Sequence, residues 1–84
     1  MEKYKVSRTI EDYVESFKEY IRGERPIVHA LGNVCMLEVE TLIDAEKNGY
    51  SHNTRKELIE EIEKIITAKE ILLKELRKNN YKID

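Results

Sequence analysis

The segment LIEEIEKIITAKEILLKEL, residues 58–76, has the periodicity of a long amphipathic helix. Its apolar side chains recur at steps of three and four residues, with Glu and Lys between them. Written as heptads, they form three rows: Ile59, Ile66 and Leu73; Ile62, Lys69 and Leu76; Leu58, Ile65 and Leu72. Three rows make a stripe too broad for one neighbouring helix to cover. The segment therefore predicts a helical bundle.

Two shorter patterns predict helices before this segment. Apolar residues follow a single helical stripe over residues 9–22, and Thr9 and Asp12 have the spacing of an N-terminal cap pair. Gly23 suits the left-handed position after a helix, and Pro26 suits the first turn of the next one. We therefore expect a second helix over residues 26–48, antiparallel to the first.

The second helix is apolar almost all the way round over residues 27–37, which is typical of a helix covered on more than one side. Asn48-Gly49 is expected to end it. Thr54 and Glu57 have capping-box spacing, so the third helix is predicted over residues 54–78. Gly32 is predicted to mark a close helix crossing.

The 84 residues, 40% apolar and 38% charged, predict one all-α domain, residues 1–84. The expected architecture is an up-down-up three-helix bundle, in which the second and third helices form a long hairpin. The first helix is too short to cover that hairpin. We therefore expect a homodimer in which two hairpins pack as a four-helix core.

The net charge and the lengths of the apolar runs restrict the possible partners of the chain. With 15 basic and 17 acidic side chains the formal charge is −2, so no overall positive field attracts nucleic acid or an anionic membrane. No apolar run approaches the roughly 18 residues that span a bilayer. We expect a cytoplasmic protein without a membrane partner.

The single cysteine, Cys35, lies in an apolar stretch and is interpreted as a buried thiol.

Residues 39–59 contain a pattern that resembles the helix-turn-helix core of lactose-repressor-type headpieces. The core reads Ala-Glu-x-x-Gly-x-Ser-x-x-Thr and is matched by Ala45, Glu46, Gly49, Ser51 and Thr54. The resemblance implies a transcriptional regulator that contacts DNA through His52, Asn53, Arg55 and Lys56. Apolar core positions of that motif are occupied here by Asp44, Asn48 and Arg55. DNA binding is therefore the second hypothesis.

Carboxylates on the second and third helices suggest a third hypothesis, a divalent-metal site. They resemble in part the Glu-x-x-Glu and Glu-x-x-Asp motifs of MazG-type nucleotide pyrophosphohydrolases, which bind magnesium. Glu38 and Glu40, however, lie about 200° apart around a helix. Glu57 with Glu61, and Glu60 with Lys64, have the i, i+4 spacing of exposed surfaces. These carboxylates are interpreted as a solvated face.

A polar stripe on the second helix contains His29, Asn33 and Glu40, together with Met36, within about 60° of one another. One interpretation is a buried polar network that binds a ligand or senses pH through His29. The other is a buried polar pair that fixes the register between helices. Lys69 is expected either to extend to the surface or to pair with an acidic residue of the second helix, Glu40 or Asp44.

No arrangement of nucleophile and base is present, because the two histidines lie in unrelated settings and Cys35 has no base on its helix face. The sequence therefore predicts no catalytic residue, cofactor or metal. By elimination, the expected function is non-catalytic: a small dimeric regulator, adaptor or inhibitor that acts on a protein partner.

Overall fold

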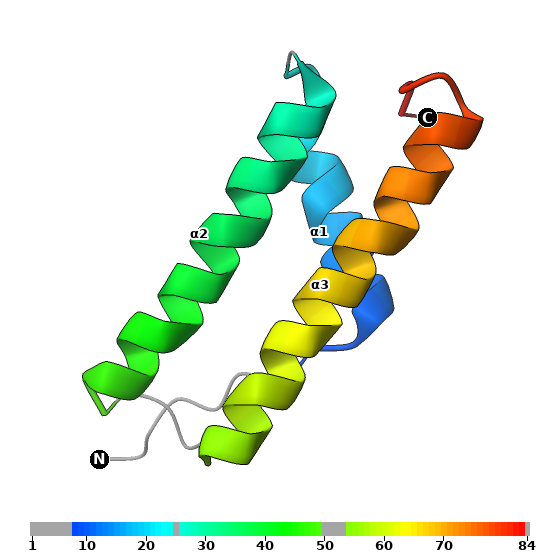
Figure 1. Cartoon of the computed structure of the whole chain (residues 1–84). Helices are drawn as coiled ribbons and strands as arrows, with labels where there is room; N and C mark the ends of the chain where they lie inside the picture. The colour runs from blue at the N-terminus through cyan, green and yellow to red at the C-terminus, as the bar shows by residue number, and fades with distance from the viewer. Residues whose placement is uncertain (1–7, 25, 50–53, 84) are drawn as a thin grey trace.

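The computed structural model describes residues 8–24, 26–49 and 54–83, and these residues form three helices and no strand (Figure 1). The helices are α1 (Ile10–Ile21), α2 (Ile27–Lys47) and α3 (Arg55–Lys78). The predicted helix ranges differ from these bounds by at most one residue at either end. The prediction of an all-helical, three-helix fold is confirmed.

The helices run up, down and up, and each packs against the other two. In Figure 1, α2 and α3 lie side by side toward the viewer and α1 lies behind them. The result is an elongated bundle whose Cα extents are 45 × 18 × 15 Å. The short α1 covers one side of the α2–α3 hairpin and leaves the other side without a helix.

Capping fixes the starts of α1 and α3. Thr9 Oγ1 accepts a hydrogen bond from the Asp12 N–H at 3.1 Å, and the Asp12 carboxylate accepts one from the Thr9 N–H at 3.2 Å. Thr54 Oγ1 likewise accepts from the Glu57 N–H at 3.2 Å. Each bond satisfies a backbone donor that the first turn of a helix leaves without a partner.

Glycines end the first two helices as the sequence predicts. Gly23 follows the C-cap of α1 with φ +84°, and Gly49 follows that of α2 with φ +72°. Both angles lie in the left-handed region, which other residues enter only with strain. Gly32 is different, since a Cβ atom added there would meet no heavy atom within 4 Å. The predicted close crossing at Gly32 is wrong for the single chain.

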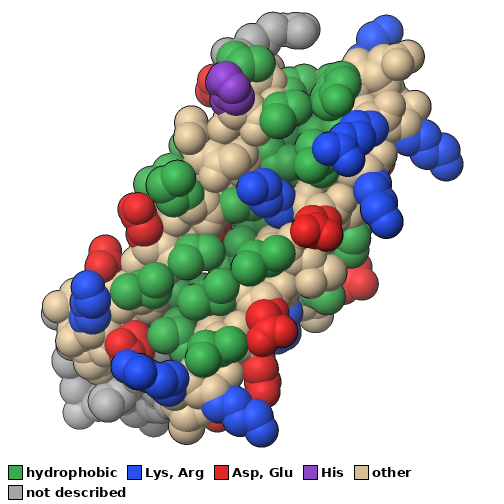
Figure 2. Space-filling view, in the orientation of Figure 1, with side chains coloured by type: hydrophobic (Ala, Val, Ile, Leu, Met, Phe, Trp, Pro, Cys, Tyr) green, Lys and Arg blue, Asp and Glu red, His purple; other side chains and the backbone are tan. Residues whose placement is uncertain are grey.

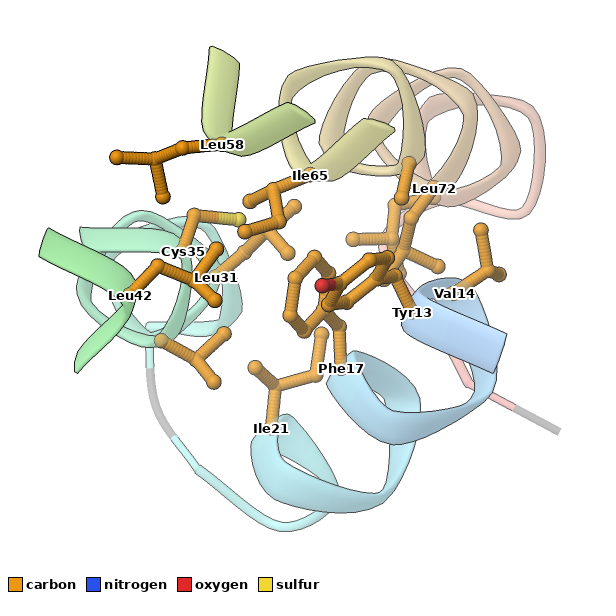
Figure 3. Close-up of a cluster of buried hydrophobic side chains, with 13 residues drawn as sticks. Tyr13, Val14, Phe17, Ile21, Leu31, Cys35, Leu42, Leu58, Ile65 and Leu72 are labelled. Carbon is orange, nitrogen blue, oxygen red and sulfur yellow. The ribbon is translucent and has the colours of Figure 1, made fainter. Parts of the chain in front are cut away.

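The core lies between the three helices and draws on one face of each (Figure 3). From α1, Phe17 and Ile21 are fully buried and Tyr13 is nearly so. The other buried hydrophobic residues are Val14, Leu31, Val34, Cys35, Leu42, Leu58, Ile65, Ala68, Leu72 and Leu76. The predicted burial of Cys35 is confirmed. Burial of this set drives α1 onto the hairpin.

α3 ends in a hook that returns the chain to the bundle. Asn80 and Tyr81 have φ values of +54° and +62°, and the Tyr81 N–H donates to the carbonyl of Leu76. The turn lets Ile83 pack against the core. Within the described residues, no helix combines the length and the apolar character needed to cross a lipid bilayer.

Candidate interaction surface

The outer row of α3 is formed by Ile59, Ile66 and Leu73, of which Leu73 is partly buried and packs against the edge of the core. Ile59 and Ile66 are each 50% exposed, whereas Ile65 is fully buried. The row lies about 100° around α3 from Ile65. Lys64, whose ammonium contacts the segment before α1, lies on the other side of Ile65. The outer row therefore points away from α1.

α2 presents apolar residues beside this row. Met36 is 59% exposed and Ile43 is partly exposed. Both lie about 80° to 100° around α2 from the buried Cys35. Glu38 lies on the opposite side of Cys35, where its carboxylate is 3.9 Å from the guanidinium of Arg8. Met36 and Ile43 therefore also point away from α1.

These residues form one apolar surface, which we call the hairpin face. It consists of Met36, Val39, Ile43, Ile59, Ile62, Ile66 and Leu73. Figure 2 shows hydrophobic side chains gathered along both helices on the side opposite α1, with a basic side chain near the middle. α2, which the sequence predicts to be covered on more than one side, packs against α1 and α3 and leaves this side open in the single chain. Continuous apolar surface of this kind marks interaction sites.

Lys69 lies on the hairpin face by its spacing, seven residues after Ile62 and four before Leu73. Its side chain is partly exposed. The ion pairs among the described residues do not include Lys69, so the predicted pair with Glu40 or Asp44 does not form there. The alternative expectation, extension to the surface, agrees with this position.

The polar stripe of α2 is exposed. His29, Asn33 and Glu40 are all accessible to solvent, as is Met36 between them. They lie about 120° to 160° around α2 from Cys35, which faces the core. The prediction that these side chains form a buried network is therefore wrong for the single chain, because α1 and α3 both pack against the other side of α2.

The helix-turn-helix-like segment, residues 39–59, is described in part. Arg55 and Lys56 are exposed in the first turn of α3, beside the exposed acidic residues Glu57 and Glu60. His52 and Asn53 lie outside the described residues. α2 and α3 run side by side in Figure 1, whereas the two helices of a DNA-binding helix-turn-helix cross at about 90–120°.

The carboxylates considered for a metal site diverge. Glu38 is partly buried and ion-paired, whereas Glu40 is exposed. Glu57 and Glu60 are exposed, as the solvated-face interpretation expects. Within the described residues, no group of three or more His, Cys, Asp or Glu side chains is placed to hold a metal ion.

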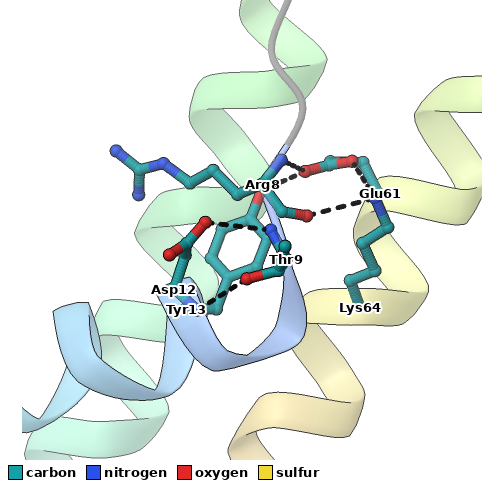
Figure 4. Close-up of polar contacts among 6 residues, drawn as sticks. All are labelled: Arg8, Thr9, Asp12, Tyr13, Glu61 and Lys64. Atoms are coloured by element: carbon teal, nitrogen blue, oxygen red, sulfur yellow. Dashed lines mark hydrogen bonds and ion pairs between the residues drawn. The ribbon is translucent and has the colours of Figure 1, made fainter.

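Glu61 departs from that interpretation, because it is only 3% exposed. Its Oε1 accepts hydrogen bonds from the Arg8 N–H and the Tyr13 hydroxyl, each at 2.8 Å (Figure 4). The Lys64 ammonium lies 3.2 Å from its Oε2. The prediction that Glu61 is solvated is wrong, since these donors replace water around the buried carboxylate.

A signal for this burial was present in the sequence. Glu61 lies three residues after Leu58 and four before Ile65, in phase with the buried row of α3. Burial, and then the neighbouring Glu61, raises the pKa of the Tyr13 hydroxyl well above its usual range. The Arg8 guanidinium lies 5.6 Å from the centre of the Tyr13 ring. The cluster therefore joins the start of α1 to α3.

Cys35 has the character of a core residue. Burial raises the pKa of its thiol to about 11, and the nearby charge of Lys69 offsets only part of that rise. At neutral pH the thiol is therefore protonated and a poor nucleophile.

Two hollows indent the described surface. One, of about 870 Å³, lies where the α1–α2 turn meets the C-terminal hook and is lined by Arg22, Gly23, Pro26, Ile27, Val28, Asn80, Tyr81, Lys82 and Ile83. The other, of about 390 Å³, lies between α1 and α2, next to Tyr20 and Leu37, which are 53% and 49% exposed. Both hollows are open to solvent.

No protein-family model, curated protein or solved structure matches the chain. The surface features described above are therefore the basis for a proposed function.

Proposed function

We propose that the chain is a non-catalytic helical protein of the cytoplasm that acts through protein contacts, as a regulator, adaptor or inhibitor, and that it works as a homodimer. The hairpin face carries this proposal. It is apolar, runs along both long helices and lies on the side that α1 leaves open. A second hairpin packed on it would complete a four-helix core.

The exposed apolar side chains of the face contribute a free energy of the same order as the cost of association. Fully burying an aliphatic side chain contributes about 1.5–3 kcal/mol. Met36, Ile59 and Ile66 are each about half exposed, so burying the rest of each side chain gains about half of that value. These three residues in two copies then contribute about 4–9 kcal/mol. The partly exposed residues of the face add to this. Association costs about 4–15 kcal/mol, which is of the same order, so the partly exposed apolar residues and the charges of the face decide the affinity of the dimer.

The alternative is a DNA-binding regulator that uses the segment around residues 39–59. It is favoured by the exposed basic pair, Arg55 and Lys56, at the start of α3. The net charge of −2 and the exposed Glu57 and Glu60 beside this pair weaken it. The hydrolase hypothesis ranks third, since Glu38 and Glu40 diverge.

Sedimentation velocity at several protein concentrations tests the homodimer. We expect wild-type protein to sediment as a dimer and Ile66→Glu to weaken the dimer at least about tenfold, because a buried unpaired carboxylate is costly. Ile71→Glu is the matched control. Ile71 lies on α3 and is 45% exposed, but it is about 140° around the helix from Ile66. A wild-type protein that remains monomeric throughout contradicts the proposal.

The same experiment with duplex DNA tests the alternative. We expect no change in sedimentation when DNA is added. A complex that forms with wild-type protein and disappears in the Arg55→Ala, Lys56→Ala double variant would establish DNA binding instead.

A further inference from the structure

We propose that the two copies pair antiparallel, hairpin face against hairpin face. The two-fold axis lies between the two faces and runs perpendicular to the helices, level with Ile66 on α3 and residue 37 on α2. This inference rests on the homodimer proposed above and specifies its geometry. The competing arrangement is parallel, in which the axis runs along the helices and α2 of one copy lies against α3 of the other.

The outer row of α3 is symmetric about Ile66. Its members, Ile59, Ile66 and Leu73, are spaced by seven residues, so all three lie on one line along the helix. A two-fold axis perpendicular to α3 at Ile66 sets that residue against its own copy. It also sets Ile59 against Leu73 of the second copy. The row is thus complementary to itself in the antiparallel arrangement, as an isologous interface requires.

The two halves of the hairpin carry opposite charge. The half nearer the α2–α3 turn, residues 38–47 and 55–66, holds eight acidic and four basic side chains. The other half, residues 27–37 and 67–78, holds two acidic and four basic side chains. Antiparallel pairing sets the acidic half of each copy against the basic half of the other. Parallel pairing sets like against like, which opposes association.

The exposed polar stripe distinguishes the arrangements as well. α2 and α3 have similar lengths, 21 and 24 residues, and are joined at one end, so their midpoints near residues 37 and 66 lie level. Antiparallel pairing then sets Asn33 within one residue of Glu40 of the second copy. An amide and a carboxylate there can form a hydrogen bond. Parallel pairing instead sets Glu40 level with Glu63 of the second copy.

Lys69 agrees with the same geometry. It lies three residues beyond the proposed axis on α3, and Glu63 lies three residues before it. Antiparallel pairing therefore sets Lys69 level with Glu63 of the second copy. Asn33 and Glu40, predicted to lie in one network inside the chain, thus meet between two chains in this arrangement.

Cross-linking of single introduced cysteines tests the orientation. Ile66→Cys is treated with a short bis-maleimide beside Ile71→Cys, the matched control on the other side of α3. Cys35 contributes little background because it is buried and its thiol has a pKa of about 11. We expect Ile66→Cys to form covalent dimers with itself about tenfold faster, or more, than Ile71→Cys.

A mixture of Ile66→Cys with a longer, tagged Met36→Cys chain tests the parallel arrangement. Antiparallel pairing predicts that each variant cross-links to its own kind. Cross-linking only between the two variants would overturn the inference and establish parallel pairing.

Sedimentation of the same samples separates the two proposals. A dimer in which Ile66→Cys reacts no faster than Ile71→Cys overturns the antiparallel geometry and leaves the homodimer standing. A monomer in sedimentation overturns both.

Discussion

Replacing Tyr13 by Phe removes one hydrogen bond from the Glu61 cluster and leaves the packing of the ring in place. Tyr13 is 1% exposed, and its ring lies 5.9 Å from that of Phe17, centroid to centroid. Its hydroxyl donates to Glu61 Oε1 at 2.8 Å. The substitution therefore isolates one contact between α1 and α3.

The expected loss follows from the charge of the acceptor. A hydrogen bond to a charged group contributes about 1.5–3 kcal/mol. Glu61 keeps its other two donors, from Arg8 and Lys64, so the carboxylate is not left without partners. We therefore expect the free energy of unfolding to fall by about 1.5–2 kcal/mol. For a domain of this size, that lowers Tm by about 6–16 °C.

Urea unfolding followed by far-ultraviolet circular dichroism measures this loss. The protein concentration is held constant, because dimer formation would couple to stability. Tyr20→Phe is the control, since Tyr20 is 53% exposed and its substitution should change stability by less than about 0.5 kcal/mol.

A double-mutant cycle with Glu61→Gln assigns the loss to the pair. If Tyr13→Phe costs no more than Tyr20→Phe, or if the cycle shows no coupling, the hydrogen bond has no net effect and the reasoning is refuted.

Four further predictions concern single residues. Burial raises the pKa of the Cys35 thiol to about 11. The stability that the buried, protonated thiol contributes is therefore full below the pKa of the unfolded chain and is lost as the pH rises toward 11. Urea midpoints measured from about pH 7 to 11 should fall, and unchanged midpoints would contradict this. Gly32→Ala should stabilise by about 1 kcal/mol, since the helical site is open. Gly23→Ala should destabilise by about 1–2 kcal/mol, because residue 23 has a positive φ. Changes in Tm of the same sign for the two alanine variants would contradict these two predictions. Thr54→Ala should cost about 1 kcal/mol by removing the α3 cap, whereas Thr67→Ala, exposed within α3, should not destabilise in urea titrations.

The sequence predicts the helices well because their signals are local. The cap pair Thr9 and Asp12 and the glycines at 23 and 49 act within one turn of the residues they affect. The apolar periodicity likewise needs only the helix that carries it. The burial of Cys35 follows from its apolar surroundings in α2.

The remaining features depend on contacts between distant residues. Glu61 is buried because Tyr13, 48 residues away, supplies a hydroxyl, and Arg8 supplies a backbone donor. No local spacing specifies those partners. The prediction that the polar stripe of α2 is buried was wrong for a related reason. The phase of α2 places His29 and Asn33 on one side, but only the position of α1 decides that this side is open.

The contact between α1 and α3 has a consequence for synthesis. The Phe17 face of α1 is buried against both later helices, and the donors at Arg8 and Tyr13 find their acceptor on α3. During translation, α1 and α2 emerge from the ribosome before Glu61 does. Their apolar faces then remain open until most of α3 has emerged. A stall just before residue 61 would therefore leave α1 without its anchor and its apolar face uncovered.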